Sequence, residues 1–167
     1  MGGEWQSVSF ENAPLQIEDG DRGTNYPKRS EFADNGHCVF LNTGNVTTSG
    51  FDLSSLDFIS AERDNLLRKG KLRRHDVVLT TRGTVGNVAY FDDNIPYDHI
   101  RINSGMVIIR PDRSELYPRF VYLYLRSRLF VSQVEALRTG SAQPQLPIRD
   151  IKKIQLKFPE LTEQKSI

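Results

Sequence analysis

Four short hydrophobic runs, punctuated by glycine and polar residues, predict β-strands. They are Cys38–Leu41, Val77–Thr80, Asn87–Phe91 and Met106–Ile109. Each run is rich in β-branched or aromatic residues, which is typical of strands. Gly83 and Gly86 bracket the connection between the second and third runs, so the pattern predicts a hairpin there.

A second kind of pattern, with apolar residues three or four positions apart, predicts helices. A long helix begins at Tyr117-Pro118 and is ended by Gly140, because proline favours the first turn of a helix. Its aromatic residues favour core packing over stacking on a ligand. They are Phe120, Tyr122, Tyr124 and Phe130.

Shorter elements flank these two patterns. Ser60 offers an N-cap for a helix over Ala61–Lys69, which Gly70 ends. Pro147 opens one helical turn before a closing strand over Ile154–Phe158.

The order of these elements predicts an α+β fold. Strands and helices alternate without a regular βαβ rhythm, and the chain has no internal repeat or long linker. Its 167 residues are the size of one domain and long enough to bury a core. We therefore expect a single domain with a twisted, largely antiparallel β-sheet and a few peripheral helices.

Composition sets limits on the class of protein. With 38% hydrophobic and 26% charged residues, the chain is typical of a globular protein. No apolar run approaches the roughly 18 residues of a membrane span, and no signal peptide is evident. The single cysteine, Cys38, fits a reducing compartment. We expect a cytoplasmic protein that does not contact a membrane.

The net charge of +1 conceals an uneven distribution. Residues 1–62 carry a net charge of −7, and residues 63–167 carry +8. A basic face directed at a polyanion is one interpretation. The other is that the two halves mix on the folded surface. The cluster from Arg68 to Arg74 is open to the same two interpretations, non-specific attraction of phosphates or a solvated face.

Enzyme motifs are weak. Asn94-Ile95-Pro96-Tyr97 is similar to the substrate motif of amino-methyltransferases, but isoleucine replaces a proline and no cofactor-binding segment precedes it. Pro111-Asp112 with Asp150-Ile151-Lys152 matches a loose pattern of Mg²⁺-dependent nucleases, in which both carboxylates bind one metal. Both patterns are more typical of ordinary turns.

Metal and nucleophile chemistry is equally weak in the sequence. The three histidines, at positions 37, 75 and 99, are far apart and have no cysteine or carboxylate at ligand spacing. Ser141 has no histidine placed to suggest a triad. The sequence therefore predicts no catalytic residue and no metal ligand.

Three polar loops combine the groups that contact nucleic acids. They are Arg22–Lys28, Thr81–Thr84 and Thr139–Gln145. Arginine can bond guanine, asparagine and glutamine can bond adenine, and hydroxyl groups bond phosphates. The alternative for each loop is an exposed polar turn that only stabilises itself.

The order of these segments resembles the target-recognition domain of the specificity subunit of Type I restriction–modification enzymes. In that family, a Gly-Ser-x-Gln-type loop leads to a short helix, a strand and a Pro-x-Leu-x-Glu-Gln entry to a long helix. Four blocks of this chain carry the resemblance. They are Asp19–Pro27, Phe40–Val46, Gly70–Phe91 and Thr139–Gln164.

The resemblance implies a DNA target-recognition domain over residues 1–159 and the start of a spacer helix over 160–167. It implies a non-catalytic component that binds double-stranded DNA and reads one half of a bipartite site. The modification subunits, and through them the restriction subunits, would act with it. S-adenosylmethionine, ATP and Mg²⁺ would belong to those partners, with no cofactor in this chain. The isolated chain, which contains little of the spacer helix, would be a monomer.

The polar loops and the resemblance together define the candidate DNA-binding residues. They are Arg22, Thr24, Asn25, Tyr26, Lys28, Thr81, Arg82, Thr84, Thr139, Ser141, Gln143 and Gln145. Two alternatives stay open at this point. The chain could be a Mg²⁺-dependent nuclease domain, or a protein-docking remnant that binds a methyltransferase without reading DNA.

Overall fold

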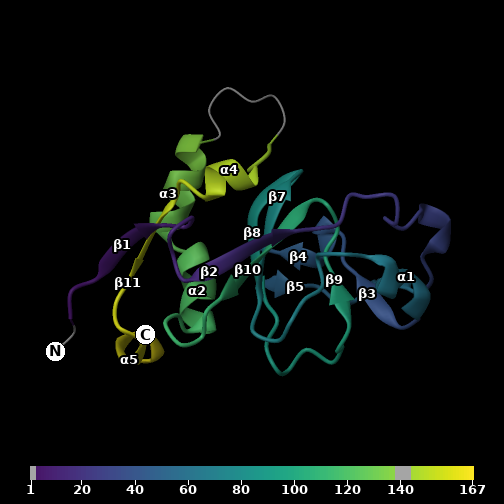
Figure 1. Cartoon of the computed structure of the whole chain (residues 1–167), viewed down its shortest axis with the longest axis horizontal. Helices are drawn as coiled ribbons and strands as arrows, with labels where there is room; N and C mark the ends of the chain where they lie inside the picture. The colour runs from purple at the N-terminus through teal and green to yellow at the C-terminus, as the bar shows by residue number, and fades with distance from the viewer. Residues whose placement is uncertain (1–2, 138–143) are drawn as a thin grey trace.

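The computed structural model describes residues 3–137 and 144–167. Its central element is a four-stranded antiparallel sheet in the order β2-β10-β7-β8 (Figure 1). The strands are β2 (Leu15–Asp19), β10 (Met106–Pro111), β7 (Val77–Arg82) and β8 (Thr84–Tyr90). The two central strands, β7 and β10, are mostly apolar because both of their faces are covered.

A two-stranded antiparallel ribbon brings the ends of the chain together. It joins β1 (Gln6–Ser9) to β11 (Gln155–Phe158). A short helix, α5 (Leu161–Lys165), follows β11. In Figure 1 this ribbon and α5 lie at the opposite end of the molecule from α1.

Residues 23–75 and 92–102, which we call the lobe, pack against one face of the central sheet. It contains a sheet in the order β6-β3-β9, in which β3 and β9 are parallel and β3 and β6 antiparallel. A small hairpin lies beside β8. The strands are β3 (Cys38–Phe40), β6 (Asp57–Ile59), β9 (Ile100–Arg101), β4 (Val46–Thr47) and β5 (Gly50–Phe51); the short helices are η1 (Arg29–Glu31), η2 (Thr43–Asn45) and α1 (Ala61–Leu66).

The remaining helices cover one side of the central sheet (Figure 1). They are α2 (Pro118–Leu125), α3 (Arg128–Leu137) and α4 (Ile148–Ile151). The expected long helix is in fact two helices. The break lies at Ser127, whose hydroxyl donates to Tyr124 O at 2.6 Å and accepts from Phe130 N at 3.4 Å. A serine that caps a new helix offers the backbone an alternative to continued helix.

Two hydrophobic cores lie on opposite faces of the central sheet. Val77, Leu79 and Ile109 point to the core beneath the helices, while Val78 and Ile108 point to the core shared with the lobe. This division follows from the alternation of side chains along a strand. Phe120, Tyr124 and Phe130 are buried, which confirms the packing role expected for the aromatic helix positions. Tyr122 is half-buried and stacks on Tyr90.

The hairpin between β7 and β8 is confirmed, with a different turn from the expected one. Gly83 alone connects the two strands and has a φ of 77°. Gly86 lies inside β8 with a φ of 97°, where the register shifts between Leu79 and Thr81. A glycine in the left-handed region at such a shift is typical of a β-bulge. The bulge lets Thr80 Oγ1 accept from Asn87 N at 2.9 Å.

The other expected elements are close to those observed. Ser60 caps α1 through its hydroxyl, which accepts from Arg63 N at 3.1 Å. The helix ends at Leu66, three residues before the expected end. Gly70 lies beyond the helix with a φ of 92°, which a right-handed helix does not allow, and an added Cβ there would lie 3.1 Å from the Gly20 Cα. The helical turn after Pro147 and the closing strand are confirmed.

The mixed architecture confirms the expected α+β class with mainly antiparallel sheets. Within residues 3–137 and 144–167, no helix has the length and apolar character needed to cross a membrane.

Candidate nucleic-acid interface

The tip of the β7–β8 hairpin joins the segment that precedes α4. Leu146 N donates to Thr81 O at 2.7 Å, and Gly83 N donates to Pro144 O at 3.3 Å. Arg82 and Gln145 face each other across an isolated antiparallel bridge. The second polar loop and the described end of the third, residues 144–145, are therefore side by side at this tip.

The turn at residues 103–105 links the tip to the first polar loop. Gly105 O accepts from Thr81 N at 2.9 Å and from Arg82 N at 3.2 Å. Ser104 O accepts from the guanidinium of Arg22 at 3.3 Å. At Gly20 the backbone passes so close to this turn that an added Cβ would lie 2.4 Å from Asn103 O. The first two polar loops thus meet at one turn, and residues 144–145 of the third join them through the β7–β8 tip.

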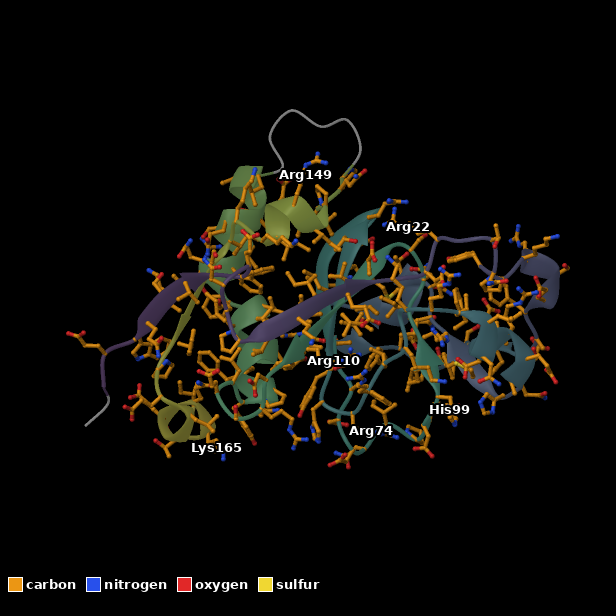
Figure 2. The ribbon with its side chains drawn as sticks, viewed as in Figure 1. Arg22, Arg74, His99, Arg110, Arg149 and Lys165 are labelled. Atoms are coloured by element: carbon orange, nitrogen blue, oxygen red, sulfur yellow. The ribbon has the colours of Figure 1, made fainter. Side chains whose placement is uncertain are left out.

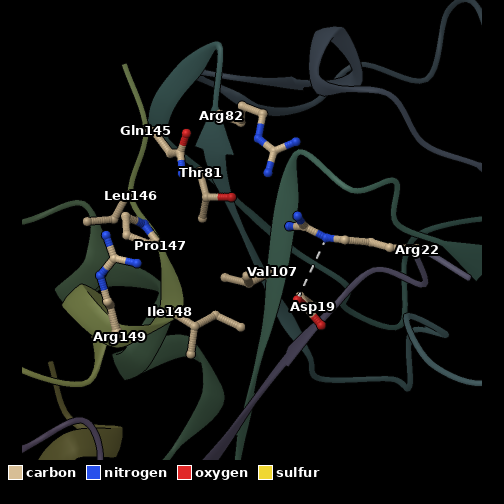
Figure 3. Close-up of a pocket in the computed structure, with 10 residues that line it drawn as sticks. All are labelled: Asp19, Arg22, Thr81, Arg82, Val107, Gln145, Leu146, Pro147, Ile148 and Arg149. Atoms are coloured by element: carbon tan, nitrogen blue, oxygen red, sulfur yellow. Dashed lines mark ion pairs between the residues drawn. The ribbon is translucent and has the colours of Figure 1, made fainter. Parts of the chain in front are cut away.

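Figure 3 shows the cleft that results, which we call the arginine cleft. Its volume is about 350 Å³. Its lining combines three guanidinium groups, one carboxylate, an amide and a hydroxyl with apolar side chains. The lining residues are Asp19, Arg22, Thr81, Arg82, Val107, Gln145, Leu146, Pro147, Ile148 and Arg149.

Three arginines reach the cleft from different elements. Arg22 follows β2, Arg82 ends β7, and Arg149 lies on α4 (Figure 3). Arg22 is half-exposed, and its Nε lies 3.9 Å from Asp19 Oδ2. The other carboxylate oxygen of Asp19 lies 2.6 Å from the Lys69 ammonium. Within residues 3–137 and 144–167, Arg82 and Arg149 form no ion pair with a carboxylate. The cleft therefore carries an excess of positive charge, which attracts anions.

A second cleft of about 400 Å³ shares Arg22 with the first. It is lined by Thr24 and Asn25, together with Arg68 and Lys69. Asp21 joins the two chain segments that line this second cleft. The backbone N–H groups of Arg68 and Gly23 both donate to the Asp21 carboxylate at 2.7 Å and lower its pKa.

Of the predicted DNA-binding residues that the structure describes, four line the arginine cleft, Thr24 and Asn25 line only the second cleft, and three line neither cleft. Arg22, Thr81, Arg82 and Gln145 line the cleft. Lys28 and Thr84 are exposed outside both clefts. Tyr26 is half-buried, its ring packs edge-on against Phe40 at 5.5 Å, and its hydroxyl accepts from Ser104 N at 3.4 Å.

Two further observations complete the placement of these residues. Asn25 lines the second cleft, and its amide donates to Leu66 O at 3.4 Å, so its side chain also anchors its own loop to the end of α1. Thr139, Ser141 and Gln143 lie outside the described residues.

The sequence reasoning missed Arg149 as a cleft residue. One signal was present, since Pro147 starts a helical turn that carries the exposed Arg149 directly after the third polar loop, and Arg149 lines the same cleft as Gln145. The Arg68–Arg74 cluster divides into two groups. Arg68 and Lys69 line the second cleft. Arg74 bonds the backbone of the turn at 92–97, with Asp92 O, Ile95 O and Tyr97 O as acceptors at 2.8–3.0 Å.

The residues of the weak enzyme motifs have local partners. Asp112 accepts from the backbone and hydroxyl of Ser114 at 3.0 and 2.7 Å. Asp150 lies 3.7 Å from Lys153 on its own helical turn. The turn that contains Asn94 and Tyr97 is held by Arg74. Both motifs are thus accounted for by turns and ion pairs.

Comparison with known proteins gives a consistent result. A family model described as "Type I restriction modification DNA specificity domain" matches residues 16–167. The specificity subunit of the Type I restriction enzyme EcoBI of Escherichia coli is 25% identical over 127 residues, which are 76% of this chain and 25% of that subunit.

Two solved structures have the same fold. One comes from work on complex assembly and conformational transition of the type I R-M system, with a TM-score of 0.71, 18% identity, and coverage of 99% of this chain and 37% of that chain. The other is the HsdS subunit from Thermoanaerobacter tengcongensis, with a TM-score of 0.68, 19% identity, and coverage of 99% and 36%. The chain spans about a quarter of the curated relative's length.

Proposed function

The chain belongs to the Type I restriction–modification DNA specificity family, and we propose that it binds double-stranded DNA through the arginine cleft. We further propose that it reads one half of a bipartite site. The observation that carries this proposal is the convergence of Arg22, Arg82 and Arg149 on one cleft.

The charges of the cleft suit a polyanion. Binding of several arginines to a phosphate backbone is favourable, because each contact releases counterions from the DNA. Arg82 and Arg149 are exposed and have no carboxylate partner within the described ranges, so binding DNA would break no internal ion pair there. This is the arrangement expected of arginines that contact DNA, whether at phosphates or at base edges.

The neighbouring groups suit base recognition. Gln145 can offer its amide to adenine, and Arg82 can offer two parallel N–H groups to guanine. Both are held on hydrogen-bonded backbone, at the β7–β8 tip and the segment paired with it, so little conformational entropy would be lost on binding. We propose Arg82 and Gln145 as base readers, with Arg22 and Arg149 as phosphate contacts.

The same proposal extends to partner proteins. DNA methylation would be carried out by modification subunits, and cleavage by restriction subunits that act through them. S-adenosylmethionine, ATP and Mg²⁺ would bind those subunits. The proposed role of this chain is recognition without catalysis, in the cytoplasm.

Helix α5 supports a link to a second recognition unit. Gln164 is buried, donates to Glu115 O and Pro159 O at 2.9 Å, and accepts from Tyr117 N at 2.7 Å. These three bonds fix the direction in which α5 leaves the domain. We propose that α5 is the first part of a spacer helix, and that the isolated chain is a monomer.

A direct test measures binding of the chain to duplex DNA by fluorescence anisotropy over a range of salt. We expect weak binding whose logarithm falls linearly with the logarithm of salt, at a slope near −0.9 per neutralised phosphate. Binding that does not change with salt would refute the proposal. Mg²⁺-dependent cleavage would favour the nuclease alternative, and methyltransferase binding without DNA affinity would favour the docking alternative.

Sequence choice requires a second experiment. The chain extended through a full spacer helix should select a bipartite site from a randomised duplex library, since linkage of two sites raises the effective concentration. Selection of no sequence by the extended chain would contradict a reading role.

A further inference from the structure

Two histidines and an aspartate converge in the lobe, outside the two clefts described above. In Figure 2 the labelled His99 lies below Arg22 and Arg149. One nitrogen each of His37 and His99 and one carboxylate oxygen of Asp64 lie within 4.8 Å of one another. His37 Nε2 is 3.5 Å from Asp64 Oδ2. The centroids of the His37 and His99 imidazole rings lie 4.2 Å apart.

The topology explains why residues so far apart in sequence meet. β3 and β9 are adjacent parallel strands, so the residues just before them lie at the same edge of the sheet. His37 precedes β3 and His99 precedes β9. Asp64 reaches the same point from α1, where it is buried.

A positive charge already occupies this cluster. The ammonium of Lys71 donates to Asp64 Oδ2 and lies 3.0 Å from His99 Nδ1. Two of the three candidate ligands are therefore arranged around a cation. The Lys71 side chain is 30% exposed on a flexible four-carbon stem, so it can swing into solvent.

Displacement of Lys71 would not leave Asp64 without a partner. The guanidinium of Arg101 also donates to the Asp64 carboxylate, and it further donates to the backbone O atoms of Asp64, Leu67 and Lys69. Arg101 is buried and held in place by these bonds. The cost of exchanging Lys71 for another cation is therefore limited.

We propose that His37, Asp64 and His99 form a site for a divalent transition metal, which competes with the Lys71 ammonium. Two imidazoles and a carboxylate are a ligand set typical of Zn²⁺, whereas Mg²⁺ and Ca²⁺ prefer oxygen ligands. Zn–N bonds of roughly 2.0–2.1 Å require a contraction of the cluster. The two histidines are exposed and lie on connecting residues, so they can supply it.

The site has room for a fourth ligand. A cleft of about 530 Å³ opens beside the two histidines, with Phe58 and Tyr97 among its walls. A water molecule can complete the coordination from this side. The neighbouring Cys38 thiol is buried and donates to Val39 O, so it is not included in the ligand set.

The metal would hold three elements of the lobe together. It would connect α1 to the entry residues of β3 and β9. A ligand that binds only the folded state raises stability by mass action, so zinc should raise the melting temperature of the chain. This inference departs from the prediction of no metal ligand made from the sequence, and it does not rest on DNA binding.

The experiment measures Zn²⁺ binding to the untagged chain by isothermal titration calorimetry and by thermal denaturation with and without metal. We expect binding of one Zn²⁺ per chain and a higher melting temperature, with no shift in Mg²⁺. His37→Ala and His99→Ala should each weaken Zn²⁺ binding by more than about tenfold, since even the loss of a supporting residue around a metal costs that much.

The variant Lys71→Met gives the sharpest result. It keeps the length of the side chain and removes the competing charge, so it should strengthen Zn²⁺ binding by about tenfold or more. His75→Asn is the matched control, because His75 lies outside the cluster and asparagine tolerates its φ of 78°. It should leave Zn²⁺ binding unchanged.

Three outcomes would overturn the proposal. The first is the absence of Zn²⁺ binding by both the unmodified chain and Lys71→Met. The second is binding by His37→Ala and His99→Ala that is as tight as binding by the unmodified chain. The third is loss of binding in His75→Asn. Circular dichroism of each variant establishes that it is folded before the titration. Since His37 and His99 are exposed, their variants should pass this test.

Discussion

The arginine cleft and the lobe both contain clustered charges, but they pair them differently. In the lobe, Lys71 and Arg101 both bind the buried carboxylate of Asp64. At the cleft, Arg82 and Arg149 have no such partner in the described part of the chain. Arg22 has only a long ion pair, of 3.9 Å, with Asp19.

This difference separates cations that hold the fold from cations that are free to bind a ligand. A basic residue whose bonds are all made internally has few groups free to bind DNA, and removal of the buried Arg101 would take from the Asp64 carboxylate one of its two basic partners. A basic residue on an exposed rim has the opposite properties. Its removal should leave stability intact and weaken binding.

The largest effect is expected in the lobe, from Arg101→Met. The substitution keeps the apolar stem and removes every bond to Asp64 and the neighbouring carbonyls. Breaking a buried ion pair costs about 3–5 kcal/mol in unfolding free energy. Urea denaturation measures this loss, and the DNA affinity of the protein that remains folded should not change. A loss below about 1 kcal/mol would show that Asp64 does not depend on Arg101.

The next effect is expected at the cleft, from Arg82→Ala and Arg149→Ala. A base reader lost to alanine costs about 1–3 kcal/mol on the preferred sequence and relaxes the choice at one position. A phosphate contact weakens all sequences alike and makes the salt slope shallower by about one. We expect the first result for Arg82 and the second for Arg149, with urea midpoints unchanged in both.

Arg119→Ala is the control for the cleft variants. Arg119 is an exposed arginine at the start of α2, outside both clefts. Its removal lowers the net charge by the same amount as either cleft variant. If Arg119→Ala reduced DNA affinity as much as Arg149→Ala, binding would depend on overall charge rather than on the cleft.

A smaller effect on the unfolding free energy is expected from Asp21→Asn, which weakens the hydrogen bonds that join the two segments lining the second cleft. The substitution removes the negative charge that accepts from Arg68 N and Gly23 N, at a cost of about 1–2 kcal/mol near neutral pH. Because the pKa of Asp21 is lowered in the folded protein, its contribution is complete above the unfolded value of about 3.9 and is lost as the pH falls through the folded value.

The pH dependence supplies the measurement for Asp21. The difference in unfolding free energy between the chain and Asp21→Asn should be constant near neutral pH and should shrink below about pH 4. A difference that persists undiminished at pH 2 would show that shape, not charge, is responsible.

The smallest effect is expected from Tyr26→Phe. The ring keeps its edge contact with Phe40, and only the bond from Ser104 N at 3.4 Å is lost. We expect changes below about 0.5 kcal/mol in stability, since long hydrogen bonds contribute little, and no change in DNA affinity by anisotropy. A marked loss of sequence choice would instead place the Tyr26 hydroxyl at the DNA.

Much of the fold could be predicted from the sequence, because local patterns determine it. Val77–Thr80 and Met106–Ile109 are strands, and Ser60 and Pro147 start helices as their chemistry requires. The patterns failed where a local rule competed with another. The apolar spacing of residues 118–137 continues past Ser127, but the Ser127 hydroxyl ends one helix and caps the next.

The candidate site was predicted only in part, because it depends on long-range contacts. Arg22, Thr81, Arg82 and Gln145 were suggested by their chemistry, and the structure brings them to one cleft. Arg149 joins them only because residues 144–146 pair with β7. The meeting of His37 and His99 depends on a parallel pairing of two very short strands, for which the sequence contains no signal.

The turn at residues 103–105 has a consequence for the evolution of sequence preference. It binds the backbone or side chains of the first polar loop and of the β7–β8 tip, and an added Cβ at Gly105 would lie 2.8 Å from Thr43. Mutations in these loops should therefore be strongly epistatic. A graft of one loop alone should fail, and a change of preferred sequence should require coordinated replacement of residues 20–26, 81–84 and 103–105.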